Sequence, residues 1–529
     1  MRFPRLIRSE RSGISLYGPW LLAFGLFLVY GADSISRYYR SAPGSYDLGI
    51  FVQVVRDYAH FHAPIVDILQ PGFNLLGDHF HPILAVLGPV FLLFPSPVTL
   101  LVAQAALFAV AAVPLVWLGR DRIGTGAAYA VGAAYGLSFG IAQAVDFDFH
   151  EIAFAVPLLA FALWAMLEDR ARPLVICCFL ALLCKEDIGL TFVLPIGITM
   201  ILRGRIRLGA GIAAMGTAGS LIAIYWIIPH FNPQHVYTYW GKNSCIGTSA
   251  ATNGATATTA HGNAISCLWD SGMSNAGTKI ELLFLLLSVT AFVALRSPLV
   301  LLAVANLGLR FISTDSSFWG TAYHYNAILM PVVCVAAIDG IERARRATSF
   351  AADEAADAAE TGAETETETD FESATEPGPA PASETAPTWQ RRWAGAVSGA
   401  MGRHGAVAML AASAAMVPQF AFNQFFNPAT FTFDARSADL RHAVSLVPGN
   451  VTVEGTVNVL APLAAKDDAF WIGNGDNPAP QYVVLDSVVS GFSGTISNPV
   501  QFVESRHSGS VYNVVWSDTY GIYVLVKVS

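Results

Sequence analysis

Charged residues are scarce in this sequence, and that scarcity limits what kind of protein it is. Only 13% of its 529 residues are Asp, Glu, Lys or Arg, whereas 54% are hydrophobic. Its mean hydropathy is +0.49. Soluble domains usually carry about 25% charged residues, so we expect a protein that crosses a membrane several times. The net charge of −9 says little about the folded parts, because acidic residues concentrate between Ala351 and Glu376.

Several catalytic signatures are absent as well. The sequence contains no G-x-x-x-x-G-K-[ST] and no H-E-x-x-H. It therefore lacks the signals of P-loop ATPases and zincins. Nothing resembles a basic patch for nucleic acid, so we expect no nucleic-acid partner. No internal repeat is visible, which weakens the case for a transporter built from inverted repeats.

Cysteine is rare, with six residues in the chain. Four of them lie in apolar runs, where cysteine behaves as a small buried hydrophobe: Cys177, Cys178, Cys184 and Cys334. Cys245 and Cys267 instead lie in a polar segment rich in Gly, Ala, Thr and Asn. If that segment is outside the cell, we expect a disulfide between them.

Basic residues indicate the orientation in the membrane. Arg2, Arg5, Arg8 and Arg11 precede the apolar run 16–30, and basic residues collect on the cytoplasmic side. The N-terminus is therefore expected inside, and the loop that follows outside. The apolar run 81–94 is shorter than the roughly 20 residues of a spanning helix, so we expect it to lie on or dip into the outer face. About eleven spanning helices then place the basic clusters inside.

Composition divides the chain into four expected parts. Residues 1–346 form a helical transmembrane domain with outer loops 34–81 and 230–278, and residues 393–426 form the last transmembrane helix. Residues 347–392, acidic and rich in Pro and Ala, cannot pack and form a disordered cytoplasmic linker.

Residues 427–529 are expected to form a small α/β domain on the outer side. A helix-like DARSADLRHAVSLV comes first. Short Val- and Tyr-rich runs follow, and we interpret them as strands: NVTVEG, QYVVLD, VQFVES, VYNVVW and YGIYVLVKV. The predicted fold class is therefore a mostly α, polytopic membrane protein with a small C-terminal extracytoplasmic α/β domain.

Asp47 is the first candidate site residue. Ionisable groups near a bilayer are costly and are by default functional candidates. A carboxylate just beyond a spanning helix can accept a proton from a substrate hydroxyl. Asp47 equally suits the N-cap of a helix that starts near Leu48. Asp78 and His79 lie in the same predicted outer loop.

A second polar motif follows a predicted outward span. Asp146 and Asp148, with His150 and Glu151 close behind, offer oxygen and imidazole ligands suited to Mg, Mn or Zn. Hydrogen bonding to a sugar, or orientation of a basic partner, is an equal alternative. A solvated turn capped by Asp is the third.

A third group of polar residues lies between apolar runs. Lys185 can hold a phosphate, with Glu186 and Asp187 paired to it or to a metal. The three can also form a self-neutralising structural ion pair. Arg310, His324 and Tyr325 complete a ring of polar groups at one depth.

These motifs, in order, resemble those of a bacterial and archaeal family of membrane proteins known as domain of unknown function 2079. The resemblance covers about residues 16–341. His81 and Glu151 depart from the expected pattern, which has a small or acidic residue and a proline there. The motifs that carry the resemblance are Tyr46 to Phe51 with Gln53, Gly77 to Phe80 with Pro82, Asp148 to His150, Lys185 to Asp187 with Gly189, and His324-Tyr325 followed by Pro331.

That family is in turn similar to the GT-C glycosyltransferases, which use polyprenyl-phosphate sugars and a catalytic acid in the first outer loop. The resemblance implies that Asp47 is the counterpart of this acid. Asp78 or His79 would orient Asp47 or the acceptor, and Lys185 with Arg310 would neutralise the leaving phosphate. It also implies a bacterial plasma-membrane protein with membrane lipids and a polyprenyl-phosphate sugar as partners, and Mg or Mn as a candidate cofactor.

Two other classes of function stay open. In a transporter or lipid flippase, Lys185, Glu186, Asp187 and Arg310 would form a polar pathway through the membrane. In a non-catalytic scaffold, the outer domain would act alone.

Overall fold

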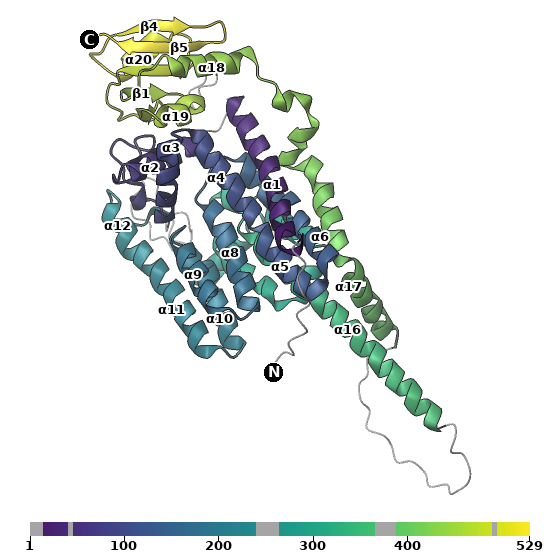
Figure 1. Ribbon diagram of the computed structural model, residues 1–529. Coiled ribbons are helices and arrows are strands. Elements are labelled where there is room, and N and C mark those ends of the chain that lie inside the picture. The colour runs from purple at the N-terminus through teal and green to yellow at the C-terminus, as the bar shows by residue number, and fades with distance from the viewer. Residues whose placement is uncertain (1–13, 41–45, 240–263, 366–387, 489–494) are drawn as a thin grey trace, which may run out of the picture.

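The computed structural model describes residues 14–40, 46–239, 264–365, 388–488 and 495–529. A bundle of helices carries a small α/β domain at one end (Figure 1). This architecture confirms the predicted fold class, a mostly helical protein with a small C-terminal α/β domain. The side of the membrane on which that domain lies stays a prediction. The predictions for residues 1–13, 41–45, 240–263, 366–387 and 489–494 concern positions outside the described residues.

Helices account for most of the described chain. The first group comprises α1 (Ile14–Tyr39), α2 (Tyr46–Ala59), α3 (Gly88–Leu93), α4 (Pro97–Val110), α5 (Ala112–Ile123), α6 (Thr125–Leu137), α7 (Phe139–Asp146), α8 (Ile152–Leu167) and α9 (Ala171–Leu182). The second comprises the π-helix η3 (Gly189–Val193), α10 (Leu194–Leu202), α11 (Ile206–Ile222), the π-helix η4 (Ala223–Ile227), α12 (Ile228–Phe231), α13 (Ala264–Met273), α14 (Ala276–Val289), α15 (Val304–Phe311), α16 (Leu329–Thr365) and α17 (Thr388–Met416). Short 3₁₀ turns join them, among them η1 (Leu75–Gly77), η2 (Pro82–Leu87), η7 (Pro298–Ala303) and η8 (Ser316–Phe318).

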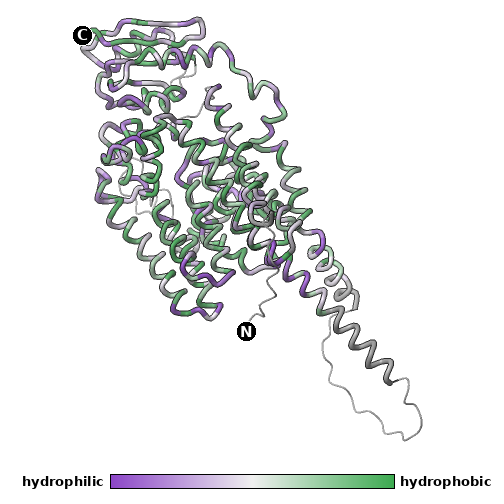
Figure 2. Tube along the Cα trace, viewed as in Figure 1, coloured by the Kyte–Doolittle hydropathy of each residue, from purple (hydrophilic) through white to green (hydrophobic). Residues whose placement is uncertain are grey.

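Apolar residues run the length of the bundle helices (Figure 2). Within the described chain, three helical runs are long and apolar enough to cross a membrane: Tyr17–Tyr39, Pro97–Ile123 and Ile206–Phe231. The pair α6 and α7, bent by 40°, is a fourth candidate. The other apolar helices found have 17 residues or fewer, below the roughly 20 of a straight spanning helix. The expected count of about eleven spans therefore stays a prediction.

The apolar run 81–94 forms η2 and α3. Together they cover Pro82–Leu93, too short for a straight crossing. Gly88 lets this segment lie against the end of α2, because a Cβ there would be 3.2 Å from the backbone of Ala59. Leu93 and Phe94 remain exposed, which is the pattern of a segment with one apolar face turned outward.

The C-terminal domain contains a five-stranded sheet in the order β2-β1-β3-β5-β4. Strand β1 pairs in parallel with β2 and β3, whereas β5 pairs antiparallel with β3 and β4. The elements are α18 (Ala435–Ser445), β1 (Thr452–Gly455), α19 (Val457–Ala464), β2 (Asp468–Trp471), β3 (Tyr482–Asp486), α20 (Pro499–Arg506), β4 (Tyr512–Ser517) and β5 (Ile522–Lys527).

The structure differs from the local expectations at three places. The run VQFVES belongs to the helix α20, because Asn498 accepts a hydrogen bond from the backbone N–H of Gln501 and Pro499 suits the first helical turn. Helix α19 and strand β2 were not anticipated, because each is short. Helix α16 continues to Thr365, past residue 347 where we expected the disordered linker to begin.

The C-terminal domain rests on α2 (Figure 1). The buried Gln53 amide donates to the carbonyl of Ala469 (2.9 Å) and accepts from the N–H of Ile68 (3.2 Å). Arg56 donates to the carbonyl of Ala464 (3.2 Å) and pairs with Asp468. A buried amide and a guanidinium thus join the first polar segment to the last domain of the chain.

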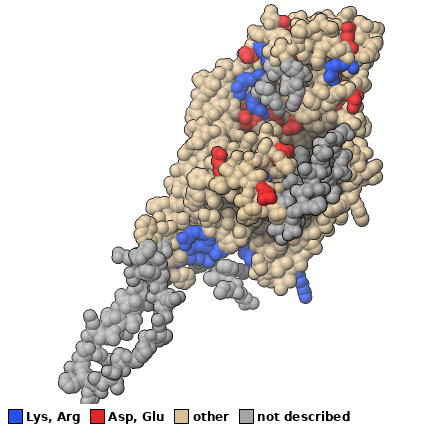
Figure 3. Space-filling view, turned by 180° about the vertical axis from the view of Figure 1, so that it is seen from behind, with Lys and Arg blue, Asp and Glu red and all other residues tan. Residues whose placement is uncertain are grey.

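Arginines tie helix ends together elsewhere in the bundle. Arg122 pairs with Glu342 (2.9 Å) and Glu168 (3.5 Å), and Arg345 donates to the carbonyls of Ile123 and Gly402 (2.6 Å each). Figure 3 shows one group of Lys and Arg side chains at the end of the bundle away from the C-terminal domain, and others on the C-terminal domain itself. This distribution agrees with the positive-inside pattern, and the orientation itself stays a prediction.

Candidate active site

Asp47 lies in the first turn of α2 and faces the loop between α7 and α8. Its Oδ2 atom is 3.4 Å from Nε2 of His150. A carboxylate in a first helical turn is favoured by the helix dipole, so the structural and functional interpretations of Asp47 are compatible. The Asp47 side chain is 35% exposed and that of His150 only 7%. An incoming hydroxyl can therefore reach this carboxylate.

His150 belongs to a stack of rings. Its ring centroid lies 3.9 Å from that of His324 and 4.9 Å from that of Phe147, both nearly parallel to it. Burial and the neighbouring His150 and Lys185 hold the pKa of His324 well below its usual range. His324 therefore favours its neutral form at physiological pH and adds no positive charge to the stack.

Arg310 holds the loop that carries His324 and Tyr325. It donates from Nε to the carbonyl of Phe318 (2.6 Å), from Nη1 to that of Tyr325 (3.2 Å) and from Nη2 to Oδ1 of Asn326 (2.8 Å). These bonds occupy all three nitrogens of a buried guanidinium. These three bonds use three of the five N–H donors of a guanidinium, so Arg310 positions this loop, and its expected role at a leaving phosphate stays a prediction.

Lys185 pairs with Glu151 rather than with its sequence neighbours. Nζ of Lys185 lies 2.9 Å from Oε1 of Glu151, and the Glu151 side chain is 2% exposed. Burial lowers the pKa of Lys185, but Glu151, Glu186 and Asp187 raise it more, so it lies well above the usual value. Glu151, expected as a metal or sugar ligand, is instead the counter-ion of Lys185.

Glu186 pairs with His79. Nδ1 of His79 lies 2.9 Å from Oε1 of Glu186, whose other oxygen accepts from the N–H of Phe80 (3.1 Å). Burial raises the pKa of Glu186, but His79 and Lys185 lower it to about 2. Burial raises the pKa of Asp187 to about 6 despite Lys185. Asp78 lies 3.8 Å from His79 and accepts from the hydroxyl of Tyr239 (3.4 Å).

Asp146 and Asp148 share Arg37 of α1. Arg37 hydrogen bonds to Asp148, and its Nε lies 3.7 Å from Asp146. Asp148 has a φ of +79°, in the left-handed region that non-glycine residues rarely occupy. Gln104 of α4 secures this backbone by donating to the carbonyl of Asp148 (2.7 Å) and accepting from the N–H of His150 (3.0 Å).

The expected metal role of these residues has no geometric support. Across the described chain no group of three or more His, Cys, Asp or Glu side chains is arranged to hold a metal ion. Asp148 is bonded to Arg37, and Glu151 to Lys185. Donors already committed to cations do not fit Mg or Mn, so we derive no step through a metal. Cys245 lies outside the described residues and the side chain of Cys267 is not described, so their disulfide stays a prediction.

The structure thus brings most of the predicted residues into one contact network. The members that were missed include Arg37, Gln104 and Tyr239. Arg37 follows Asp33 by one helical turn, and such a charged pair directly after the apolar run 16–30 is a signal that the sequence does contain. Gln104 is a single amide in an apolar run and carries no comparable signal. Only tertiary contact identifies it.

The fold resembles that of solved GT-C enzymes. ArnT from Cupriavidus metallidurans, in a crystal structure bound to undecaprenyl phosphate, matches with a TM-score of 0.52 and 14% identity over 97% of this chain and 98% of that chain. Its apo structure matches with a TM-score of 0.50 and 13% identity over the same shares. At this identity the likeness shows the fold alone.

Comparison by sequence gives the family. No curated protein matches this sequence. Residues 37–360, more than half of the chain, match the model of the family described as "Predicted membrane protein (DUF2079)". The matched range contains Asp47, Lys185 and His324. The chain therefore belongs to the DUF2079 family of membrane proteins, and it has a GT-C-like fold.

Proposed function

We propose that this protein is a glycosyltransferase that moves a sugar from a polyprenyl-phosphate donor to a hydroxyl group on the outer side of the membrane. The observation that carries the proposal is the meeting of Asp47, His150 and the Lys185–Glu151 pair at the ends of helices that are far apart in sequence. A carboxylate that is open to solvent lies in the same network as a buried cation.

Asp47 would act as the general base. As the acceptor oxygen bonds to the anomeric carbon, its proton passes to the Asp47 carboxylate. The bond from the anomeric carbon to the phosphate oxygen breaks, and its electron pair stays on the phosphate. His150, 3.4 Å from Asp47, would hold the carboxylate in place.

Lys185 would receive the phosphate. An ammonium group has three N–H donors, and within the described chain Glu151 accepts from one of them. The others can bind phosphate oxygens and stabilise the charge that develops as the sugar leaves. The undecaprenyl phosphate in the ArnT structure supports a carrier of this class.

The test uses the full chain purified into lipid nanodiscs with undecaprenyl-phosphate hexoses. The release of undecaprenyl phosphate is measured for the wild type, for Asp47→Asn and for Asp468→Asn. We expect Asp47→Asn to lose about 100-fold or more in rate, the usual contribution of a general base. The control carboxylate, Asp468, is 61% exposed on the C-terminal domain and should tolerate the change.

Two results would reject the proposal. One is equal turnover by wild type and Asp47→Asn. The other is transport of the lipid-linked sugar across liposomes by folded Asp47→Asn protein, which would favour the flippase.

A further inference from the structure

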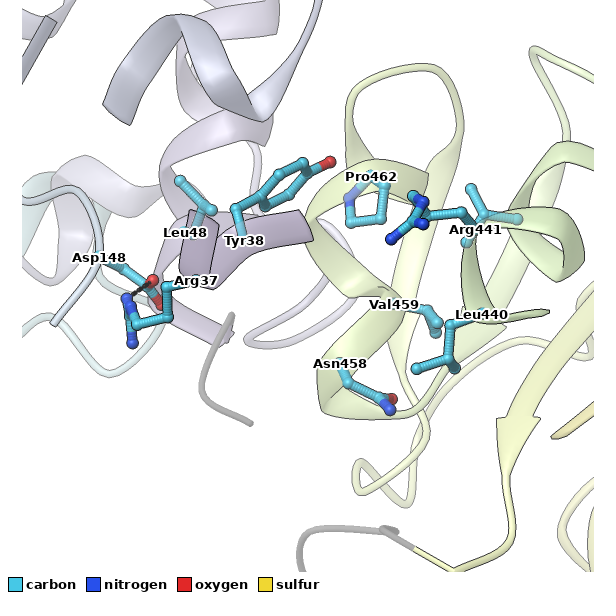
Figure 4. Close-up of a pocket in the computed structure, with 10 residues that line it drawn as sticks. Arg37, Tyr38, Leu48, Asp148, Leu440, Arg441, Asn458, Val459 and Pro462 are labelled. Atoms are coloured by element: carbon cyan, nitrogen blue, oxygen red, sulfur yellow. Dashed lines mark hydrogen bonds and ion pairs between the residues drawn. The ribbon is translucent and has the colours of Figure 1, made fainter. Parts of the chain in front are cut away.

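A cavity of about 100 Å³ lies between the helical bundle and the C-terminal domain, next to the candidate active site (Figure 4). One wall comes from α1, the start of α2 and the loop after α7, including Arg37, Tyr38, Leu48 and Asp148. The other comes from α18 and α19. Asp47 does not line the cavity, but burial and the nearby carboxylates of Asp47 and Asp146 raise the pKa of Asp148, which does. The proposed general base therefore lies near the cavity. A buried water needs about 10 to 15 Å³, so this volume holds a small polar head group.

The bundle wall offers a hydrogen-bond acceptor. The side chain of Asp148 is 9% exposed. Its Oδ1 bonds to Arg37, but Oδ2 is buried without a hydrogen-bond partner among the described residues. A buried carboxylate oxygen left in this state costs free energy. A ligand hydroxyl donated to Oδ2 would satisfy it.

The C-terminal wall offers a positive charge. Arg441 of α18 lines the cavity and donates to the backbone carbonyl of Tyr39, with its guanidinium 5.9 Å from the rings of Tyr39 and Phe433. Within the described chain no carboxylate pairs with it, in contrast to Arg37 and Arg436. Figure 4 shows Arg441 across the cavity from the Arg37–Asp148 pair. The remaining surface of this wall is mainly apolar, from Val444, Val459 and Pro462.

We propose that this cavity binds the sugar acceptor, and that the acceptor is a hydroxylated molecule with an anionic group, either a phosphate or a carboxylate. Its hydroxyl end faces Asp148 and the neighbouring Asp47, and its anionic group binds Arg441. The identification of the bound molecule as the sugar acceptor rests on the proposed function. The binding chemistry itself follows from an unpartnered carboxylate oxygen and an uncompensated guanidinium on opposite walls of one cavity.

The test is a binding measurement that needs neither donor nor turnover. Labelled glucose 6-phosphate, glucuronic acid and glucose are each equilibrated by dialysis with the full chain in nanodiscs. We expect at least one of the two acids to bind about tenfold or more tightly than glucose, because a hydrogen bond to a charged group contributes about that factor. The stronger of the two identifies phosphate or carboxylate.

Substitutions locate the binding. Arg441→Gln should weaken the binding of the acid about tenfold, Arg441→Lys less, and Val444→Phe should block it by filling the cavity. Arg170→Gln is the matched control, since Arg170 also lies over an aromatic ring, 4.9 Å from that of Trp164, but on another part of the bundle. Thermal unfolding checks each variant, and Val444→Phe tests the cavity with every charge retained.

Three outcomes would overturn the inference: no preference for the acids over glucose, unchanged binding in Arg441→Gln, or equal losses in Arg170→Gln. The two proposals fail separately. Acid binding without any sugar transfer by the wild type rejects the enzyme and keeps the site, whereas transfer without acid binding rejects the site and keeps the enzyme.

Discussion

Nζ of Lys185 lies 2.9 Å from Oε1 of Glu151, and this contact joins the turn after α9 to the turn before α8. Both side chains are mostly buried, at 19% and 2% exposure. A buried ion pair contributes little net stability compared with apolar residues, but removal of one partner leaves an uncompensated charge. The pair therefore stabilises one arrangement of the two turns, and it keeps Lys185 beside the candidate active site.

Lys185→Met should destabilise the protein by about 3 to 5 kcal/mol, because Glu151 would be left buried without its cation. The double variant Lys185→Met/Glu151→Gln should recover part of that loss. Chemical unfolding in one detergent gives the four free energies of the cycle, those of the wild type, Lys185→Met, Glu151→Gln and the double variant. Additive losses from the two single changes would show that the residues do not interact.

His79 should make stability depend on pH. Burial and Lys185 lower its pKa, but Glu186 and Asp78 raise it more, so the pKa lies above the usual 6.5. The stabilisation that protonated His79 gains from these carboxylates is then complete below about pH 6.5. It is lost as the pH rises through the folded-state pKa of His79. The difference in melting temperature between wild type and His79→Gln should be largest near pH 6 and shrink toward pH 8.5.

The carboxylate of Glu186 sets the lower limit of the pH range in which its pair with His79 stabilises the protein. Its pKa is lowered from 4.5 to about 2, so its contribution is present above about pH 4.5 and is lost only as the pH falls toward 2. A melting difference for His79→Gln that grows with pH would contradict the pairing.

Arg310→Ala should loosen the loop around His324. The change leaves the carbonyls of Phe318 and Tyr325 and the amide of Asn326 without their donor, at about 1 to 3 kcal/mol for each buried group. Hydrogen exchange should become faster in residues 316–328, and the melting temperature should fall. If the variant instead keeps the exchange rates and the melting temperature of the wild type and only binds undecaprenyl phosphate more weakly, Arg310 is a phosphate ligand.

Gln53→Ala should loosen the contact between the bundle and the C-terminal domain. It removes the bonds to Ile68 and Ala469, at about 1 to 3 kcal/mol for each buried backbone group. Limited proteolysis between residues 417 and 434 should become faster. Gln70→Ala, at an exposed position in the loop after α2, is the control. Equal rates of proteolysis in the two variants would show that Gln53 does not hold the two parts together.

Local pattern predicted a good part of the fold. The helix of residues 435–445 follows from Asp434 as its N-cap, with a bond of 2.7 Å from the N–H of Ser437. The run VYNVVW forms β4 as expected. The run VQFVES shows where local pattern fails, since its β-branched residues favoured a strand whereas the cap at Asn498 decided for a helix.

The candidate site was predictable as a set of residues but not as a set of pairs. Lys185 was expected to pair with Glu186 or Asp187, its neighbours in sequence, yet it pairs with Glu151, while Glu186 pairs with His79. Arg310 was expected at a phosphate, and it binds its own loop. Neighbours in sequence at a helix end often point in different directions, so proximity along the chain is a poor guide to which charges meet.

The sequence by itself determined the membrane class, the family and the presence of ionisable motifs between apolar segments, because hydropathy and residue order are local properties of the chain. The tertiary structure decided which of those motifs meet, that Arg37 and Gln104 join them, and that α18 and α19 close a cavity against Arg37 and Asp148. These outcomes depend on how helix ends come together in space, and each requires contacts between segments that are tens to hundreds of residues apart.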